Sequence, residues 1–182
     1  SFDQQTNLIF LQKSGFTDVS RNNKPFTGTC ESCHMNGRKH RRVDFIEGKE
    51  DGLDTTFYES GCPQVIRSFS LGKEDGKWMY MYDSTGYLAW EENYVMTEKH
   101  GQQIYFSKPE KNEKGVYFQD TVKIENYKNG ILHGVKATFY KRDFEGIGGS
   151  IKREAVYSDG VLNGTFKIYN LNTISIEIKI IM

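Results

Sequence analysis

The chain has little proline, little cysteine and no long apolar run. Its 182 residues include three prolines and three cysteines. An odd and small number of cysteines argues against a disulfide framework in a chain of this length, and it favours a reducing, cytoplasmic compartment. No run of about 18 apolar residues occurs, so the sequence predicts no membrane-spanning helix. The chain starts at Ser1 rather than Met, which leaves export after removal of a signal segment open.

The chain also lacks net charge. Lys plus Arg and Asp plus Glu both number 24, and the formal net charge is zero. General nucleic-acid-binding proteins usually carry a basic excess, so we expect no nucleic-acid partner. Aromatic residues and glycine are abundant instead, with 12 Phe, 11 Tyr and 18 Gly. Such a composition is typical of short strands joined by tight turns.

A glycine repeat runs through most of the sequence. It is visible in EGKEDG, LGKEDG, NGILHG and DGVLNG, and TEKHG is a copy that lacks the first glycine. The second glycine of each linker anchors the next repeat, and the anchors are Gly28, Gly52, Gly76, Gly101, Gly134 and Gly164. An aromatic residue stands three positions before the first linker glycine or its counterpart Thr97, at Phe45, Phe69, Tyr94, Tyr127 and Tyr157. Five positions after the anchors stand Cys33, Phe57, Met81, Phe106, Phe139 and Tyr169.

Each repeat predicts one β-hairpin. A strand follows the anchor glycine, a glycine-marked turn such as Asn36–Gly37 reverses the chain, and a second strand leads to the linker. One hairpin is only marginally stable alone, so the hairpins should stack edge to edge. The sequence therefore predicts an all-β, elongated repeat protein of consecutive antiparallel hairpins in one continuous sheet. The column that contains Cys33 and Phe57 should lie mostly on one buried face.

The repeat also predicts the organisation of a single domain, residues 1–182. Residues 1–23 form an N-terminal strand or incomplete repeat, in which Asn7–Leu11 is expected to cap the open edge of the sheet. The following hairpin repeats are 24–48, 49–72, 73–97, 98–130 and 131–160, and 161–182 form a C-terminal repeat. The repeats that begin at Gly101 and Gly134 are longer than the others, and we assign their excess to the hairpin loops.

Residues Cys30–His34 read CESCH, which is the attachment motif of c-type haem. In the repeat register these residues lie in a strand, where residues three apart face opposite ways. Cys30 and Cys33 would then neither hold one ligand nor form a disulfide. We interpret Cys33 as a small core residue and His34 as half-exposed, and we expect no haem, no metal and no other cofactor.

The repeats resemble those of the MORN-repeat-variant family. The run Asn23–Gly28, the 24-residue spacing and the linkers NGILHG and DGVLNG carry this resemblance over residues 23–182. YwqK-like members are regarded as antitoxin components of bacterial toxin–antitoxin modules. The resemblance implies a hairpin-repeat fold and a protein partner, which in the YwqK-like members would be a toxin. CESCH and the long fourth and fifth repeats depart from the family pattern.

The sequence favours a non-catalytic, protein-binding repeat module of antitoxin or immunity type. The alternative is binding to a membrane surface or lipid headgroup, which the basic run Arg38–Arg42 could support. An enzyme is not expected, and no catalytic residue is assigned. The adjacent Glu91 and Glu92 would split across two faces of a strand, and no helix-forming stretch follows the glycine-rich segment 145–149 to bind phosphate.

The longer loops 107–115 and 141–150 are the best candidates for a binding surface. In a stack of hairpins such loops emerge from the same edge, so these two should be neighbours. Repeat proteins often carry insertions on the binding side, and exposed aromatic residues anchor contacts. The predicted partner-binding residues are Lys108, Lys111, Arg142, Phe144 and Ile147.

Overall fold

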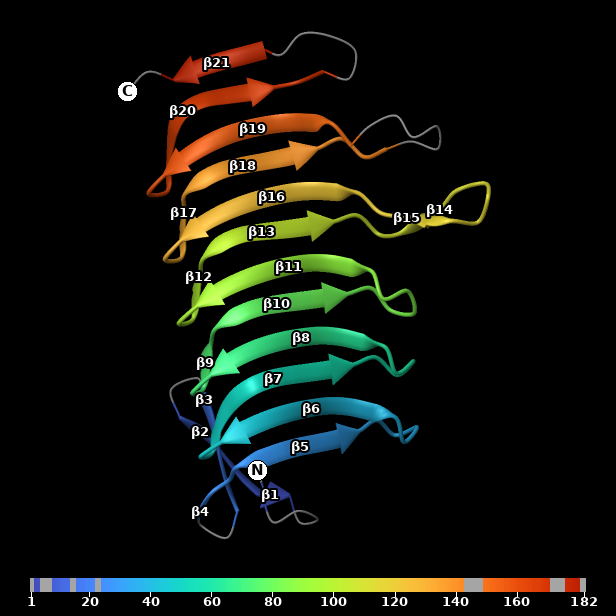
Figure 1. Ribbon diagram of the computed structural model, residues 1–182, viewed down its shortest axis with the longest axis vertical. Coiled ribbons are helices and arrows are strands. Elements are labelled where there is room, and N and C mark those ends of the chain that lie inside the picture. Colours follow the sequence, from blue (N-terminus) through green and yellow to red (C-terminus); the bar gives the residue numbers. More distant parts are fainter. Residues whose placement is uncertain are drawn as a thin grey trace. The chain divides into compact units, whose positions relative to one another are not determined.

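The computed structural model is all-β in the part of the chain that it describes, residues 2–3, 8–13, 16–21, 24–142, 149–170 and 176–180 (Figure 1). No helix in this part is long and apolar enough to cross a membrane. The chain divides into two compact units, which are unit 1 (residues 1–86 and 94–97) and unit 2 (residues 87–93 and 98–182).

The main sheet of unit 1 is antiparallel, with the strand order β5-β6-β7-β8-β10. The short strand β9 pairs with β8. The bounds are β5 (Gly28–Cys33), β6 (Lys39–Ile46), β7 (Lys49–Phe57), β8 (Pro63–Ser70), β9 (Lys73–Glu74) and β10 (Gly76–Met81).

The N-terminal strands of unit 1 form a separate sheet. They are β1 (Phe2–Asp3), β2 (Leu8–Lys13), β3 (Phe16–Arg21) and β4 (Lys24–Pro25), and they pair in that order. The strand that we expected near Leu8 exists, but the prediction that it caps the main sheet is wrong. Strands β2 and β3 pair with each other along their whole length, and β3 contacts β7. The backbone hydrogen bonds of the N-terminal hairpin are thus made within its own sheet, and the hairpin does not add a strand beside β5.

The main sheet of unit 2 is also antiparallel, with the order β11-β13-β16-β18-β19-β20-β21. Its strands are β11 (Leu88–Val95, of which the last two residues belong to unit 1), β13 (Gly101–Phe106), β16 (Thr121–Lys128), β18 (Gly134–Phe139), β19 (Ile151–Ser158), β20 (Val161–Ile168) and β21 (Ile176–Ile180). The short strands are β12 (Glu98–Lys99) beside β11, β17 (Ile131–Leu132) beside β16, and the separate pair β14 (Glu110–Lys111) and β15 (Tyr117–Phe118).

The anchor glycines mark the repeat in both units. Four of them are the first residues of β5, β10, β13 and β18, each of which has six residues. Gly52 and Gly164 lie inside β7 and β20, where the linker and the following strand are continuous. The predicted all-β class and the succession of antiparallel hairpins are therefore confirmed.

The aromatic column has a structural reason. Its residues are the cross-strand partners of anchor glycines, in the pairs Phe45–Gly28, Phe69–Gly52, Tyr127–Gly101 and Tyr157–Gly134. An aromatic ring opposite glycine covers backbone that would otherwise be exposed, and it helps to fix the strand register. Glycine and aromatic residue are thus two halves of one recurring contact.

The linker turns need positive φ at both central residues, as in the type I′ turns of hairpins. In Leu71–Gly72 the φ angles are 50° and 80°, and in Asp159–Gly160 they are 50° and 81°. The N–H of the second residue donates to the preceding linker, as from Gly72 to Glu50 O at 2.7 Å. Thr97 keeps this bond, to Glu74 O at 2.7 Å, but adopts a φ of 76° that is unfavourable for a β-branched residue.

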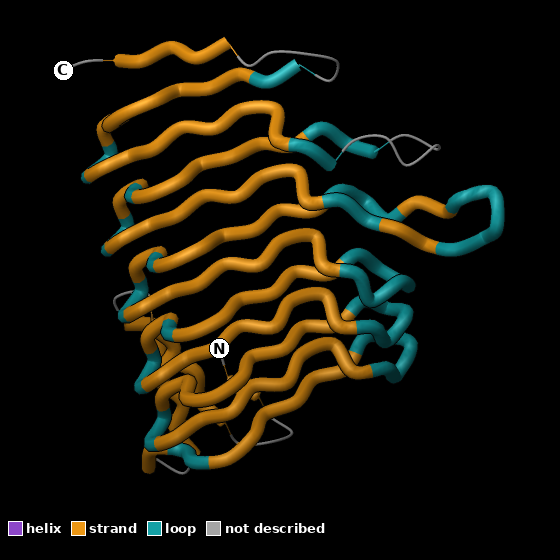
Figure 2. Tube along the Cα trace, turned by 45° about the horizontal axis from the view of Figure 1, so that its top comes forward, coloured by secondary structure: helices purple, strands orange, loops and turns teal. Residues whose placement is uncertain are grey.

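The prediction that the Cys33 column lies on a buried face is wrong in its degree of burial. Cys33 is exposed and the other five members are half-buried. The described strands of unit 2 lie in one layer (Figure 2), so no second sheet there covers either face. Among the residues whose burial the structure describes, the buried side chains include the apolar Val43, Phe45, Trp78, Ala89, Ala137 and Ala155 and the polar Asp54, Glu92, Gln103, Asp120 and Glu125. Polar and charged side chains therefore occupy many of the buried positions that a hydrophobic core would fill with apolar residues.

The CESCH segment follows the repeat, with one correction. Cys30, not Cys33, packs against the buried pair Val43 and Phe45. Cys30 is half-buried and Cys33 is exposed, as opposite faces of a strand predict. His34 is half-buried, as expected, and its Nε2 donates to Phe57 O at 2.8 Å.

The role of His34 is explained by the later repeats. Tyr58 and Tyr140 occupy its position, and their hydroxyls donate at 2.8 Å to the carbonyls of Met81 and Tyr169. His34 thus supplies an N–H where other repeats supply a tyrosine O–H.

Candidate functional site

The insertion between β13 and β16 forms a small hairpin at one edge of unit 2 (Figure 1). Its stem is closed by Ser107 and Asp120. The Ser107 N–H donates to Asp120 O at 2.8 Å, and the Asp120 N–H donates to Ser107 Oγ at 3.1 Å. Gln119 Nε2 donates to Ser107 O at 2.8 Å and to Leu88 O at 2.5 Å. The stem is therefore tied to the main sheet.

Asn112 organises the turn between β14 and β15. Its Oδ1 accepts the N–H groups of Lys114 at 3.0 Å and Val116 at 2.9 Å. Its backbone O accepts the N–H of Gly115, whose φ is 77°. An asparagine side chain that mimics a backbone turn in this way gives the loop a defined shape. We call residues 111–117 the hairpin tip.

The second long loop meets this hairpin, as predicted. Lys141 Nζ forms an ion pair with Glu110. Arg142 donates through its backbone N–H to Asp120 Oδ2 at 3.0 Å and through Nε to Asp120 Oδ1. The Asp120 side chain is only 3% exposed, whereas that of Arg142 is 42% exposed, so a buried carboxylate is held by a cation that is open to solvent on one side. Phe144 and Ile147, which we also expected here, lie outside the described residues.

The hairpin tip exposes an aromatic and an aliphatic side chain. Val116 is 58% exposed and Tyr117 is 42% exposed. The Lys111 ammonium lies 4.8 Å from the centre of the Tyr117 ring. The ring of Tyr87 lies 6.1 Å from that of Tyr117, and the Tyr87 hydroxyl donates to Tyr117 O at 3.4 Å. Tyr117 is thus supported from two sides and open to solvent.

The predicted site residues that the structure describes, Lys108, Lys111 and Arg142, differ in role. Lys108 is exposed and Lys111 belongs to the tip. Arg142 is engaged by Asp120, by Gln119 O at 3.0 Å and by the ring of Phe118, which lies 5.9 Å from its Cζ. Its observed contacts hold the two loops together.

Sequence reasoning missed Tyr117 and Asp120. We placed the end of the loop at residue 115, whereas the inserted hairpin continues to the start of β16 at Thr121. The aromatic pair Tyr117–Phe118, followed by an aspartate, was the available indication of a second short strand.

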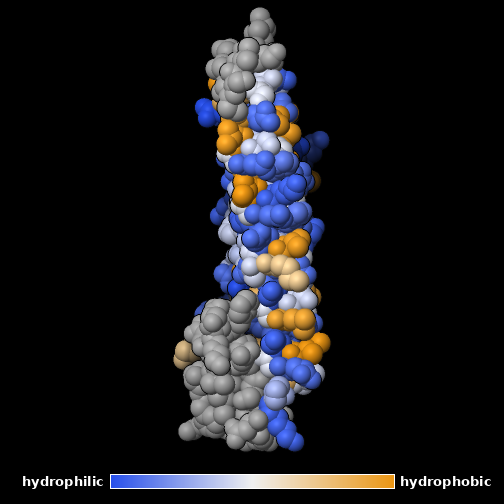
Figure 3. Space-filling view, turned by 90° about the vertical axis from the view of Figure 1, so that its left-hand side faces the viewer, coloured by the Kyte–Doolittle hydropathy of each residue, from blue (hydrophilic) through white to orange (hydrophobic). Residues whose placement is uncertain are grey.

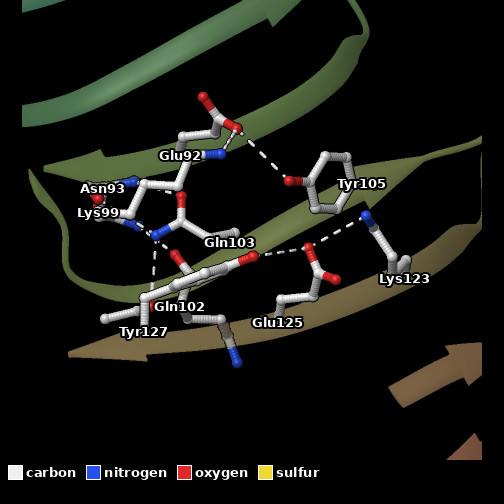
Figure 4. Close-up of polar contacts among 10 residues, drawn as sticks. Glu92, Asn93, Lys99, Gln102, Gln103, Tyr105, Lys123, Glu125 and Tyr127 are labelled. Atoms are coloured by element: carbon white, nitrogen blue, oxygen red, sulfur yellow. Dashed lines mark hydrogen bonds and ion pairs between the residues drawn. The ribbon is translucent and has the colours of Figure 1, made fainter. Parts of the chain in front are cut away.

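A polar cluster on one face of unit 2 is a second candidate (Figure 4). The Glu92 carboxylate accepts from Lys99 Nζ at 2.5 Å and from the Tyr105 hydroxyl at 3.4 Å. Glu125 lies between Lys123, at 3.1 Å, and Lys136, at 2.9 Å. Each carboxylate is therefore matched by at least one lysine.

The electrostatics of this cluster favour fixed charges. Burial raises the pKa of Glu125, but hydrogen bonds from Lys136 and Lys123 outweigh it and hold the pKa below its ordinary value. Burial also raises the pKa of Tyr105, and the negative charges of Glu92 and Glu125 raise it further. The Glu125 carboxylate therefore stays ionised and the Tyr105 phenol stays neutral at pH 7. Such an arrangement holds strands together and does not suit proton transfer.

Gln103 is fully buried beside this cluster. Its Oε1 accepts the Asn93 N–H at 2.9 Å, and its Nε2 donates to Asn93 O at 3.1 Å (Figure 4). The side-chain amide therefore makes the two bonds that a neighbouring backbone would make, which is a structural role.

Unit 1 holds a comparable group around Asp54. The Asp54 side chain is 0% exposed. It accepts from Arg41 Nε at 2.8 Å, from a second Arg41 nitrogen at 3.0 Å, and from Arg67 at 2.5 Å. Arg41 also pairs with Glu50 at 3.0 Å, and the guanidinium of Arg67 lies 5.4 Å from the Trp78 ring centre.

The basic run Arg38–Arg42 is matched within unit 1. Arg38 donates to the carbonyls of Glu59 and Ser60, and Arg41 is engaged by Asp54. Lys39 and Arg42 both approach Glu31, at 2.7 and 3.6 Å. Lys39, Arg41 and Arg42 thus pair with carboxylates, whereas Arg38 donates to carbonyls, so less of this positive charge is available to a lipid surface than the sequence suggested.

The linker turns carry exposed apolar side chains. They are Ile46, Leu71 and Met96 in unit 1 and Ile131 and Val161 in unit 2. On the edge seen in Figure 3, apolar spots alternate with polar surface. Scattered single apolar residues are normal on protein surfaces, so they do not define a binding patch.

No group of three or more His, Cys, Asp or Glu side chains in the described part of the chain could hold a metal ion. Comparisons with protein-family models and with curated proteins give no match to this chain. The hairpin tip, whose base is held by the buried Asp120 and its partner Arg142, is the candidate functional site.

Proposed function

We propose that this chain is a non-catalytic protein-binding repeat module whose hairpin tip contacts the partner. The resemblance of its repeats to the MORN-variant family extends the proposal to a partner of toxin type, with the chain as antitoxin or immunity protein. That extension rests on family analogy, whereas the binding proposal rests on the geometry of the tip.

The observation that carries the proposal is an exposed aromatic residue on a pre-ordered support. Tyr117 is held by Tyr87 and Lys111, and the loop below it is closed by Asn112 and by the buried Asp120. Interface hot spots are enriched in tyrosine, and a contact that is already ordered loses less entropy on binding.

Site-specific photo-crosslinking tests the proposal. A benzophenone amino acid replaces Val116 in the tip, and in a matched control it replaces Leu71, which is 64% exposed in a linker turn. Both variants are produced and irradiated in the organism that makes this protein. We expect a discrete protein adduct from position 116 and none from position 71, and we expect Tyr117→Ala to reduce the yield.

Circular dichroism of each variant checks that the β-sheet signal is unchanged. Equal adducts from positions 116 and 71, or none from 116, would contradict a binding role of the tip.

A further inference from the structure

We propose that the partner presents an acidic protein segment with a neighbouring apolar residue to the hairpin tip. This inference rests on the proposed function, because it names the chemistry that the same site would recognise. It starts from the distribution of charge around the tip.

The carboxylates at the base of the hairpin are already matched. Glu110 pairs with Lys141, and Asp120 pairs with Arg142. Within the described residues no carboxylate lies within ion-pair distance of Lys108, Lys111 or Lys114. Three lysines therefore stand against one further acid, Glu113, on a chain whose formal net charge is zero.

The positive charges lie beside the exposed ring. The Lys111 ammonium is placed over Tyr117 at 4.8 Å, where the ring face attracts it and limits its motion. A carboxylate that approached this ammonium would lie close to the ring and to the exposed Val116. The tip thus offers cationic and apolar contacts together, which complements an acidic segment that carries an apolar side chain.

Lysine suits such a partner. Its ammonium is a point charge that can donate to a carboxylate from several directions, whereas arginine favours a planar, bidentate geometry. The arginine at this edge, Arg142, is used internally on Asp120. The three lysines can therefore adapt to the position of a partner's carboxylate, whereas Arg142 is committed to Asp120.

The test uses a defined probe. A fluorescein-labelled peptide of about 12 residues, rich in Glu with interspersed Leu, is titrated with the whole protein at low salt, where charge attraction is strong. The same peptide with Lys in place of Glu is the probe control. Anisotropy reports binding, and vesicles of phosphatidylcholine with phosphatidylglycerol serve as a lipid probe in a flotation assay.

Charge reversal identifies the site. Lys108→Glu, Lys111→Glu and Lys114→Glu are combined in the tip variant. Lys49→Glu, Lys73→Glu and Lys128→Glu, at exposed linker positions, make the same change in net charge elsewhere. We expect the tip variant to weaken binding of the acidic peptide at least about tenfold and the control variant to weaken it less than about twofold.

Equal weakening in both variants, or equal binding of the two peptides, would overturn the inference. So would binding of the anionic vesicles, but not of the acidic peptide, with loss in the tip variant, because a lipid surface would then be the ligand. The crosslink from position 116 separates the two proposals. If it persists in the tip charge variant, the acidic chemistry fails while the binding role stands, and if it is absent from the otherwise unaltered chain, the binding role itself fails.

Discussion

Asp54 in unit 1 and Glu125 in unit 2 are both buried carboxylates, and different cations neutralise them. Each lies in the middle of a strand and accepts from two basic side chains. Asp54 is gripped by two arginines and its side chain is 0% exposed, whereas Glu125 is gripped by two lysines and its side chain is 7% exposed. In a sheet with little apolar core, a carboxylate can occupy the centre of a strand if the neighbouring strands bring cations to it.

The difference between the two groups lies in how much each depends on its carboxylate. Arg41 aims two nitrogens at Asp54, and the partly buried Arg67 adds a third bond. Lys123 and Lys136 each make one contact with Glu125 through a single ammonium, and exposure does not separate the two groups, because Arg41 at 41% is no less exposed than Lys123 at 34% or Lys136 at 38%. We therefore expect the arginine-held group to be the more sensitive to mutation.

The largest effect is expected for Asp54→Ala. Removing this carboxylate leaves two guanidinium groups without their main acceptor, and the free energy of unfolding of unit 1 should fall by about 3 to 5 kcal/mol. Urea denaturation followed by tryptophan fluorescence measures it, because Trp78 lies beside Arg67. A loss smaller than about 1 kcal/mol would show that water replaces the carboxylate as easily as in an exposed pair.

Glu125→Gln should cost less, about 2 kcal/mol at pH 7, through the loss of two charge-assisted hydrogen bonds. The pKa of Glu125 is lower in the folded chain than its ordinary value of 4.5. The contribution of the Glu125 carboxylate to the free energy of unfolding is therefore fully present above its ordinary pKa of 4.5, and it is lost as the pH falls through the pKa in the folded chain. Denaturation at pH 7 and at about pH 3 checks this, since the difference between the two proteins should shrink in acid. A difference that is unchanged at low pH would contradict the assignment.

Arg41→Lys converts part of the unit 1 group into the unit 2 arrangement. A lysine cannot reproduce the two parallel bonds to Asp54 or the additional one to Glu50, so we expect a loss of about 1.5 kcal/mol. Denaturation of the variant at low and high salt measures both the loss and its screening. Wild-type stability would mean that the planar arginine geometry contributes nothing here.

The smallest expected effect is a gain in stability, at the linker that has Thr97 in place of the first linker glycine. Thr97→Gly should raise the free energy of unfolding by about 1 kcal/mol, because glycine adopts the positive φ of this position without strain. Gly72→Thr, at the equivalent position of the preceding linker, is the matched control and should be destabilising. Thermal denaturation compares the two, and equal effects of one sign would refute the explanation by backbone strain.

The sequence predicted the strands well and their burial poorly. Anchor glycines and aromatic residues form one cross-strand contact, so their spacing reports the register directly. Burial of Phe57 or Met81 depends on whether another layer covers the sheet, and periodicity carries no information on that. The placement of β2 outside the main sheet has the same cause, because a strand pattern does not name its partner.

The sequence predicted that the two long loops are neighbours, but it did not predict the contacts between them. The repeat register brought loops 107–115 and 141–150 to the same edge, and the ion pairs Lys141–Glu110 and Arg142–Asp120 join them. The sequence could not show that Arg142 holds the loops together while Tyr117 is exposed. In a charged loop, an arginine or a tyrosine can either make internal contacts or face solvent.

The sequence by itself determined the hairpin repeat, because turns with positive φ favour glycine and the backbone beside glycine favours an aromatic partner. Only the tertiary structure decided which charges are neutralised and which remain available. Asp54 meets cations 13 positions away on either side, and Glu110 meets Lys141 across 31 positions. Ion pairs over such separations depend on the side chains that the sheet brings together, and composition alone, with its zero net charge, shows none of them.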